Sequence, residues 1–328
     1  MNKKSIPEVI GAFRHTQLLL TAARLKIFSS VYHQPQTSEE LAETLSSKPR
    51  GIRILCDALV AQGYLEKTAD NKYHCPNESF ETFVEGGEFS REETCLFSIN
   101  QYQRWGKLYD LIKVDTVDVN KKEEPEQEEV DVTKQTFGKA LDRGAKVSAK
   151  QTADLINLTN QKSMLDIGGG SARYIEAFGK KYPNLELNIL DHPDMLTVAK
   201  TNIEAAGLSS RVRFFSGDMF EYEFEQKFDF ILLSNVIHMF SVEENIRLFK
   251  RIGTWLNQGG LIVVKDFKLE ENRSEPLDSA MFAMHMYLYN SGDCYTLSQV
   301  KHFFKAANVS FEKACDVGKS STLILARS

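Results

Sequence analysis

The feature that most constrains the fold is an alternation of short apolar runs with amphipathic segments between Ser163 and Phe267. The runs are SMLDI, LELNILD, VRFFSGD, FDFILLS and GGLIVVKDF, and helical patterns such as SARYIEAFGKKY separate them. Strands that are apolar along their whole length are typical of a parallel sheet covered by helices on both faces. A helix over 297–307, followed by VSFEKACDV and SSTLILAR, predicts an antiparallel edge. The sequence therefore indicates an α/β domain with a mostly parallel, seven-stranded sheet.

The N-terminal part has a different pattern, typical of a winged helix. Apolar residues recur at helical spacing over residues 6–33, and Thr37 with Glu40 forms a capping box before a short second helix. Pro49 opens a third helix over 48–62, and a hairpin follows around the turn TADN. We predict an α-helical winged-helix domain over 1–112, an acidic linker over 113–136 and the sheet domain over 137–328.

Size and composition fit a two-domain globular protein of the cytoplasm. The chain has 328 residues, and domains average about 150 residues. A net charge of −5 argues against a nucleic-acid or membrane-surface partner. The 5 cysteines are scattered without a C-x-x-C pair, which is typical of free thiols in a reducing compartment. No apolar run approaches the length of a membrane span, and the N-terminus does not read as a signal peptide.

A glycine loop follows the first strand, in LDIGGGSARY. Glycines at this place let a ligand lie against the backbone beyond the carboxyl ends of the strands. The dinucleotide fingerprint G-x-G-x-x-G would begin at Gly168 and Gly170, but its third glycine is replaced by Arg173. Asp166 is also unfavourable beside a pyrophosphate. An acid here suits a cationic ligand without phosphate, such as S-adenosylmethionine.

Three further polar residues end the next three strands. Asp191 lies about twenty residues after the glycines, where a carboxylate accepts ribose hydroxyls in nucleotide-binding folds. Asp218 ends the third strand and can accept the adenine amine, with Met219 packing on the ring. Ser234 ends the fourth strand, near the expected amino-acid end of the ligand. Each acid could instead be a helix cap or a turn residue, but acids at successive strand ends favour the ligand site.

These blocks resemble a known family. LDIGGGSARY, ILDHP, SGDMF and LLSNVIHMFSVEENIRLFKRI are similar to the small-molecule O-methyltransferases of plants and bacteria, of the caffeate and hydroxyneurosporene type. The resemblance implies a Rossmann-like S-adenosylmethionine-dependent methyltransferase domain with a reversed final strand, and S-adenosylhomocysteine as the product. The resemblance also implies a homodimer formed through the N-terminal winged helix. The sequence has no cluster of acids and amide like that of the metal-dependent catechol enzymes, so we expect no metal.

The candidate general base is His238, in SNVIHMF just past the fourth strand. A lone histidine is more often structural, but by the resemblance His238 matches the family's catalytic histidine, and Asp266 takes the place of the first of two flanking glutamates. The chain departs from the family at Met239, where an aspartate is usual, and at Cys294, which replaces the second glutamate. Asp293 is adjacent to Cys294 but should point elsewhere in an extended backbone. These departures leave oxygen and carbon methylation both open.

The acceptor is expected to lie against the helix predicted over residues 277–290. Met281, His285 and Tyr289 share one face at four-residue spacing, and together with Met239 they are our candidate substrate residues. A stripe of this composition is also compatible with a plain core helix. By the resemblance this helix covers the substrate, which favours a small aromatic or apolar hydroxyl compound.

Two rival interpretations remain at this stage. The winged helix could belong to a transcription regulator with a ligand-sensing domain, since Lys48, Arg50 and Arg53 lie on its third helix. Acidic residues surround that helix, so we interpret the domain as a dimer interface. The second rival is a methyltransferase-like protein that binds S-adenosylmethionine but has lost catalysis.

Overall fold

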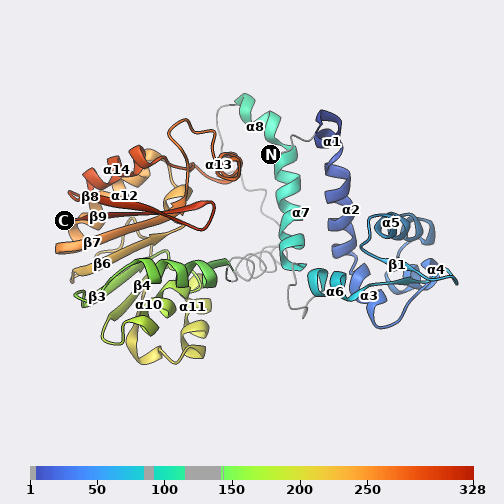
Figure 1. Cartoon of the computed structure of the whole chain (residues 1–328), viewed down its shortest axis with the longest axis horizontal. Helices are drawn as coiled ribbons and strands as arrows, with labels where there is room; N and C mark the ends of the chain where they lie inside the picture. Colours follow the sequence, from blue (N-terminus) through green and yellow to red (C-terminus); the bar gives the residue numbers. More distant parts are fainter. Residues whose placement is uncertain (1–4, 85–91, 115–141, 143) are drawn as a thin grey trace. The chain divides into compact units, whose positions relative to one another are not determined.

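The alternating segments form one seven-stranded sheet, as the sequence predicts (Figure 1). The structure is a computed structural model that describes residues 5–84, 92–114, 142 and 144–328. The strands of the sheet are β3 (Ser163–Ile167), β4 (Glu186–Asp191), β5 (Val212–Ser216), β6 (Phe228–Ser234), β7 (Leu256–Phe267), β8 (Ser310–Val317) and β9 (Ser321–Arg327). Their order is β5-β4-β3-β6-β7-β9-β8, with β9 antiparallel to both neighbours. The predicted antiparallel edge is therefore confirmed.

Helices cover both faces of this sheet, which explains why its strands are apolar throughout. A helical segment over 144–155 packs with α10 (Arg173–Lys181) and α11 (Pro193–Ala205) on one face. The other face carries α12 (Val242–Trp255) and α14 (Leu297–Ala306). The remaining elements of this unit are α8 (Leu108–Val114), η1 (Ser209–Arg211), η2 (Ile237–Met239) and α13 (Leu277–Tyr289). The capping box that the sequence predicts at Ser241 is present, with Glu244 as its partner.

The strand order fixes where a ligand can bind. β3 lies between β4 and β6, so the chain first builds outward from β3 in one direction and then returns to its other side. In open α/β sheets ligands bind beyond the carboxyl ends of the strands at such a reversal. The glycine loop follows β3 at this point, and η2 with His238 follows β6. The fold thus places the predicted site residues along one edge of the sheet.

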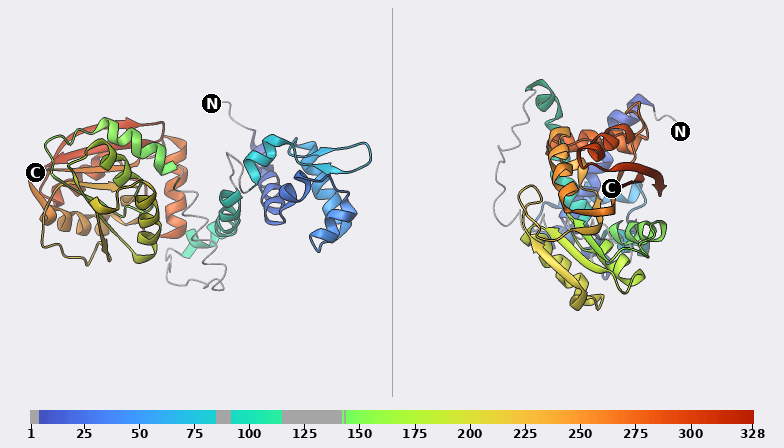
Figure 2. Two further views of the ribbon diagram at one scale, coloured as in Figure 1. Left: turned by 90° about the horizontal axis from the view of Figure 1, so that it is seen from below. Right: turned by 90° about the vertical axis from the view of Figure 1, so that its left-hand side faces the viewer.

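The N-terminal unit has the predicted hairpin and the predicted helices before it, but the helix expected over residues 6–33 is divided into three, with Lys26 in a left-handed conformation before the third. Its elements are α1 (Ile6–Gly11), α2 (Phe13–Arg24), α3 (Ile27–Tyr32), α4 (Ser38–Thr44), α5 (Pro49–Ala61), β1 (Glu66–Lys67), β2 (Tyr73–His74), α6 (Asn77–Phe83) and α7 (Glu92–Gly106). Thr37 caps α4 in the expected capping box with Glu40. Apolar side chains from α2 to α6 and from the hairpin form its own core. Figure 2 shows the ribbon of this unit from two further directions.

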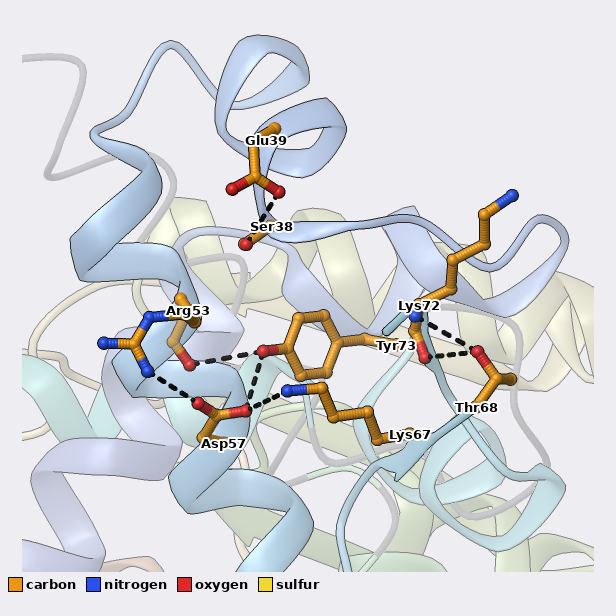
Figure 3. Close-up of polar contacts among 8 residues, drawn as sticks. All are labelled: Ser38, Glu39, Arg53, Asp57, Lys67, Thr68, Lys72 and Tyr73. Atoms are coloured by element: carbon orange, nitrogen blue, oxygen red, sulfur yellow. Dashed lines mark hydrogen bonds and ion pairs between the residues drawn. The ribbon is translucent and has the colours of Figure 1, made fainter. Parts of the chain in front are cut away.

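A polar cluster joins α5 to the hairpin. The Asp57 carboxylate accepts hydrogen bonds from Arg53 at 3.0 Å, from Lys67 at 2.8 Å and from the Tyr73 hydroxyl at 2.8 Å (Figure 3). The hydrogen bonds from Lys67 and Tyr73 hold the pKa of the Asp57 carboxyl below its usual range. One acid on this helix therefore holds two of the nearby basic side chains and fixes the hairpin against α5.

The described residues divide into two units, one ending at Lys107 and one beginning at Leu108. This division places α8 with the sheet, where the Tyr287 hydroxyl donates to the Leu111 carbonyl at 3.2 Å. Apart from its first two residues, the predicted linker over 113–136 lies outside the described residues, and the domain limits stay a prediction. Among the described helices none has the length and apolar character needed to cross a membrane.

Candidate active site

The glycine loop after β3 needs its glycines for both conformation and space. Gly168 and Gly170 have φ values of +66° and +54°, in the left-handed region that favours glycine. A Cβ on Gly168 would lie 2.9 Å from the Val236 side chain, and one on Gly169 would lie 2.8 Å from an Asp166 carboxylate oxygen. Residues 168–170 are partly exposed, and the Val236 and Asp166 side chains pack closely against the loop.

Asp191, at the end of β4, is tied directly to this loop. Its carboxylate accepts the Gly170 N–H at 2.8 Å and the His192 N–H at 2.7 Å. Burial raises the pKa of the Asp191 carboxyl, while these two N–H donors oppose the rise. The sequence prediction that Asp191 and the glycines lie together is confirmed in position; its contact with a ribose stays a prediction. The helix-cap alternative is not realised, since α11 begins at Pro193 after His192.

Asp166 lies fully buried beneath the loop and has no hydrogen-bond partner among the described residues. Burial raises the pKa of its carboxyl well above the aspartate range, and the neighbouring Asp191 carboxylate raises it further. The Ser234 hydroxyl, at the end of β6, is also buried without a hydrogen bond of normal length. Buried polar groups are normally satisfied, so these atoms indicate a missing partner. The ammonium group of S-adenosylmethionine fits an unpaired carboxyl at this edge.

Met219 is buried beside the same loop. A Cβ added to Gly168 would lie 3.6 Å from the Met219 Cε. Asp218, the residue before it, is exposed and accepts the Phe220 N–H at 2.8 Å. The turn role that the sequence left open for Asp218 is therefore present, and its contact with adenine stays a prediction. Sequence reasoning missed Met195 on α11, whose Cε would lie 3.8 Å from a Cβ on Gly170.

The candidate base and its carboxylate meet across two neighbouring strands. His238 in η2 and Asp266 in β7 are 8% and 4% exposed, and His238 Nδ1 lies 2.7 Å from Asp266 Oδ1. The same Oδ1 accepts the Phe267 N–H at 2.7 Å, which orients the carboxylate, and Oδ2 has no partner among the described residues. With Asp266 ionised, Nδ1–H donates to it and Nε2 is left as the proton acceptor.

The segment after α13 packs against His238 and Asp266. Cys294 is buried, and burial with the nearby Asp266 and Asp293 carboxylates raises the pKa of its thiol to about 12. Asp293 pairs instead with Arg273, so it points away from the base as expected. Gly292 lies against the His238 backbone so closely that an added Cβ would come within 1.9 Å of the His238 carbonyl oxygen.

Aromatic rings surround the imidazole of His238. Phe267 and Phe282 stack on one another at 4.0 Å, and each meets the His238 ring edge-on, at 5.5 and 5.1 Å. Sequence reasoning missed both phenylalanines, although the aromatic content of residues 277–290 was a signal. His285 stacks on Phe282 at 5.7 Å, and Tyr289 lies 4.6 Å from His285.

The four predicted substrate residues therefore do not share one environment. His285 and Tyr289 continue the aromatic series that starts at His238. Met281 and Met239 are 50% and 37% exposed. Burial lowers the pKa of the His285 imidazole, and the His238 imidazole opposes its protonation as well. No group of three or more His, Cys, Asp or Glu side chains arranged to hold a metal occurs in the part of the chain that the structure describes.

The antiparallel β9, the glycine loop with acidic residues near the ends of β3, β4 and β5, and the buried His238–Asp266 pair match the pattern from which the sequence predicts a methyltransferase. The comparisons with known proteins give the family. The model of the O-methyltransferase domain matches residues 123–310, and the model of the O-methyltransferase dimerisation domain matches residues 8–80. The chain belongs to this O-methyltransferase family and is an S-adenosylmethionine-dependent enzyme.

The chain is similar to relatives of stated activity and to solved structures. It is 23% identical over 303 residues to the 3-hydroxy-5-methyl-1-naphthoate 3-O-methyltransferase of Streptomyces sahachiroi, covering 90% of this chain and 86% of that one. A solved structure of PigF with SAH superposes with a TM-score of 0.88 at 19% identity and covers 100% of both chains. The L-tyrosine C(3)-methyltransferase of Streptomyces lavendulae is 27% identical over 153 residues, 45% of this chain and 42% of that one.

Proposed function

We propose that the enzyme methylates a hydroxyl group of a small aromatic or apolar molecule, with His238 as the general base and Asp266 as the residue that orients it. The observation that carries this proposal is the 2.7 Å hydrogen bond between buried His238 Nδ1 and Asp266 Oδ1. The His238–Asp266 pair lies at the edge of the sheet where the glycine loop also lies. The aromatic rings of Phe267 and Phe282 beside His238 support a flat, apolar acceptor.

Asp266 and His238 have different roles in the proton transfer. Asp266 holds Nδ1–H, so the Nε2 lone pair of His238 faces away from the carboxylate and can take the acceptor's hydroxyl proton. Transfer from a phenol of pKa about 10 to an imidazole of pKa about 6.5 is uphill by about 5 kcal/mol in water. A carboxylate at hydrogen-bond distance stabilises the imidazolium that forms and reduces this cost. General-base assistance of this kind contributes about 10²–10⁴ in rate.

The cofactor, when bound, supplies an electrophilic methyl group whose bond to sulfur breaks as the bond to oxygen forms. We assign its site to Asp166, Gly168, Gly170, Asp191, Asp218, Met219 and Ser234. Asp166 would face the ammonium group, and Asp191 the ribose hydroxyls. The glycine backbone would lie along the ligand, and Met219 would cover the adenine. The unpaired Asp166 carboxyl and the buried Ser234 hydroxyl support this assignment.

The acceptor would lie between η2 and α13, against Met239, Met281, His285 and Tyr289. Because burial lowers the pKa of the His285 imidazole, it would meet the acceptor uncharged near neutral pH. A neutral imidazole can donate one hydrogen bond and accept another. This favours an acceptor with a second uncharged polar group near the reacting hydroxyl.

Carbon methylation is the second candidate. It is favoured by the similarity to the L-tyrosine C(3)-methyltransferase. Carbon 3 of tyrosine is the ring carbon next to the one that bears the hydroxyl group. The same base would serve, since removing the phenolic proton also activates that carbon. Mass spectrometry with proton NMR of the product distinguishes a methoxy group from a ring methyl group.

The winged helix is proposed to join two copies of the chain rather than to bind DNA. Residues 8–80 match the dimerisation domain of the family, which supports a homodimer. Two basic side chains near α5, Arg53 and Lys67, are both paired with Asp57 (Figure 3). The pairing with Asp57 makes Arg53 and Lys67 less available for phosphate contacts, whereas Lys48 and Arg50 are exposed. Sedimentation of the purified chain and a gel-shift assay with mixed DNA test this assignment.

The general-base role is tested with His238→Ala. We expect turnover of a catechol, flavonoid or quinol acceptor to fall by at least about 10²-fold, while calorimetry still detects binding of S-adenosylhomocysteine. His302→Ala on α14 is the matched control, because His302 is exposed and outside the site. Turnover that survives in His238→Ala would remove His238 from the base role.

A further inference from the structure

Lys265 is a buried cation that the proposed mechanism does not use. It lies in β7, is 5% exposed, and is followed directly by Asp266. Its Nζ donates a hydrogen bond to Asn235 Oδ1 at 2.9 Å. Burial lowers the pKa of the Lys265 ammonium, and the nearby Asp266 carboxylate opposes this. A buried lysine beside an uncharged amide is costly to keep, so its contact with Asn235 requires an explanation.

Asn235 is the residue at which the chain leaves β6. Its φ of +57° is left-handed, a conformation that asparagine tolerates better than most residues. Its N–H donates to the Lys265 carbonyl at 2.8 Å, directly after the pairing of Ser234 with Lys265 in the sheet. Two hydrogen bonds therefore join Lys265 and Asn235. One uses the Lys265 backbone carbonyl and the other uses the Lys265 side chain.

The next residue of β7 holds the other end of the same turn. Successive side chains of a strand point to opposite faces, and Asp266 extends to the face opposite Lys265, where it binds His238 at 2.7 Å. The turn from Asn235 to His238 is thus fixed at its first residue by Lys265 and at its last by Asp266.

We propose that Lys265 and Asn235 are positioning residues for His238, because together they fix the turn that carries the imidazole to Asp266. The consequence for catalysis rests on the proposed role of His238 as the base. A left-handed asparagine without its side-chain contact can relax toward the commoner regions of φ and ψ, and the three residues that follow would move with it. A displacement of about 1 Å of a catalytic group can cost about 10²-fold in rate.

The direct test follows the Nδ1 proton of His238 by NMR in the full-length protein with S-adenosylhomocysteine bound. The protein is labelled with ¹⁵N-histidine, and His238→Asn identifies the resonance. Lys265→Met removes the ammonium but keeps the chain length, and Asn235→Gly removes the amide but suits the left-handed backbone. Lys268→Met is the matched control, because Lys268 is paired with Glu270 and Asp316 and does not contact the turn.

We expect the proton to exchange with water at least about tenfold faster in both Lys265→Met and Asn235→Gly, since a local opening frees its hydrogen bond. The double variant should exchange no faster than the faster single variant, because both changes remove one contact. Lys268→Met should match the unmodified protein. This readout does not depend on turnover, so it stays interpretable even if His238→Ala shows that His238 is not the base.

Turnover and binding give the second readout. The positioning role predicts that kcat falls about tenfold in Lys265→Met, while the dissociation constants of S-adenosylhomocysteine and of 5′-methylthioadenosine stay within about threefold. Unchanged proton exchange in a folded Lys265→Met would overturn the proposal. So would a loss of affinity confined to S-adenosylhomocysteine, because only that ligand has a carboxylate, and Lys265 would then be a cofactor-binding residue.

Discussion

Replacing Asp166 with asparagine tests the reasoning about the cofactor most sharply. Asp166 is fully buried, has no hydrogen-bond partner among the described residues, and sits beside the Asp191 carboxylate. Because its folded pKa is raised, the native state holds this proton more tightly than the unfolded state. Stability therefore falls as the pH rises from the ordinary aspartate range toward the raised pKa. Asp166→Asn removes that loss and should stabilise the free protein.

The size of the two effects can be worked out from the contacts. Leaving a buried polar group unsatisfied costs about 1–3 kcal/mol, and more if the group is charged. Each kcal/mol that Asp166→Asn recovers corresponds to about 2–4 °C in the melting temperature of a domain of this size. A hydrogen bond to a charged group contributes about 1.5–3 kcal/mol. Its loss should weaken binding of S-adenosylhomocysteine by about 10- to 150-fold, at about 1.4 kcal/mol per factor of ten.

The assay is calorimetry in buffers of different ionisation enthalpy. An ammonium group arriving beside Asp166 favours the carboxylate, so binding should release a proton and tighten as the pH rises toward the raised pKa. Asp166→Asn should release none, and 5′-methylthioadenosine, which lacks the ammonium group, should release none from the unmodified protein. A variant that melts lower, binds S-adenosylhomocysteine normally and releases the same proton would refute this reasoning.

Three further predictions concern the surroundings of His238. Gly292→Ala places a Cβ within 1.9 Å of the His238 carbonyl oxygen, so kcat should fall by at least about tenfold while calorimetry still detects S-adenosylhomocysteine. Cys294→Glu adds a second carboxylate near Asp266, which should favour the imidazolium and move the acidic limb of the pH–rate profile to higher pH; a shift to lower pH would contradict this. Because the pKa of the His285 imidazole is lowered in the fold, stability should fall as the pH drops through about 6.5. His285→Phe should flatten that part of the pH–melting curve.

The strands and their caps could be predicted because their causes are local. Fully apolar runs separated by amphipathic helices leave few alternatives to a covered parallel sheet. Thr37 and Ser241 cap helices through residues only three positions away. The pairing of His238 with Asp266 was expected from the resemblance to the family, and the fold explains it. Both follow or end strands that run side by side, so their carboxyl ends reach the same edge of the sheet.

Other features depend on packing that no local pattern records. The aromatic run over 277–290 is compatible with a core helix, and only the fold brings Phe282 against Phe267 and His238. The sequence places Asp166 at the end of its strand, but it does not record that the carboxyl is fully buried and has no hydrogen-bond partner among the described residues. Lys265 looks like an ordinary residue at a strand end, and its contact with Asn235 follows from the left-handed turn that ends β6.

The proposed role of His238 as the general base also constrains the acceptor. One carboxylate, Asp266, supports the His238 imidazolium, and burial raises the pKa of the neighbouring Cys294 thiol to about 12, so it stays uncharged near neutral pH. A second carboxylate in the place of Cys294 would lower the cost of proton transfer, and its absence leaves more of that cost to the acceptor. Each unit by which the acceptor's pKa falls below 10 lowers the cost by about 1.4 kcal/mol. Hydroxyl groups made acidic by a carbonyl or a fused aromatic ring are therefore better matched to this site than a simple phenol.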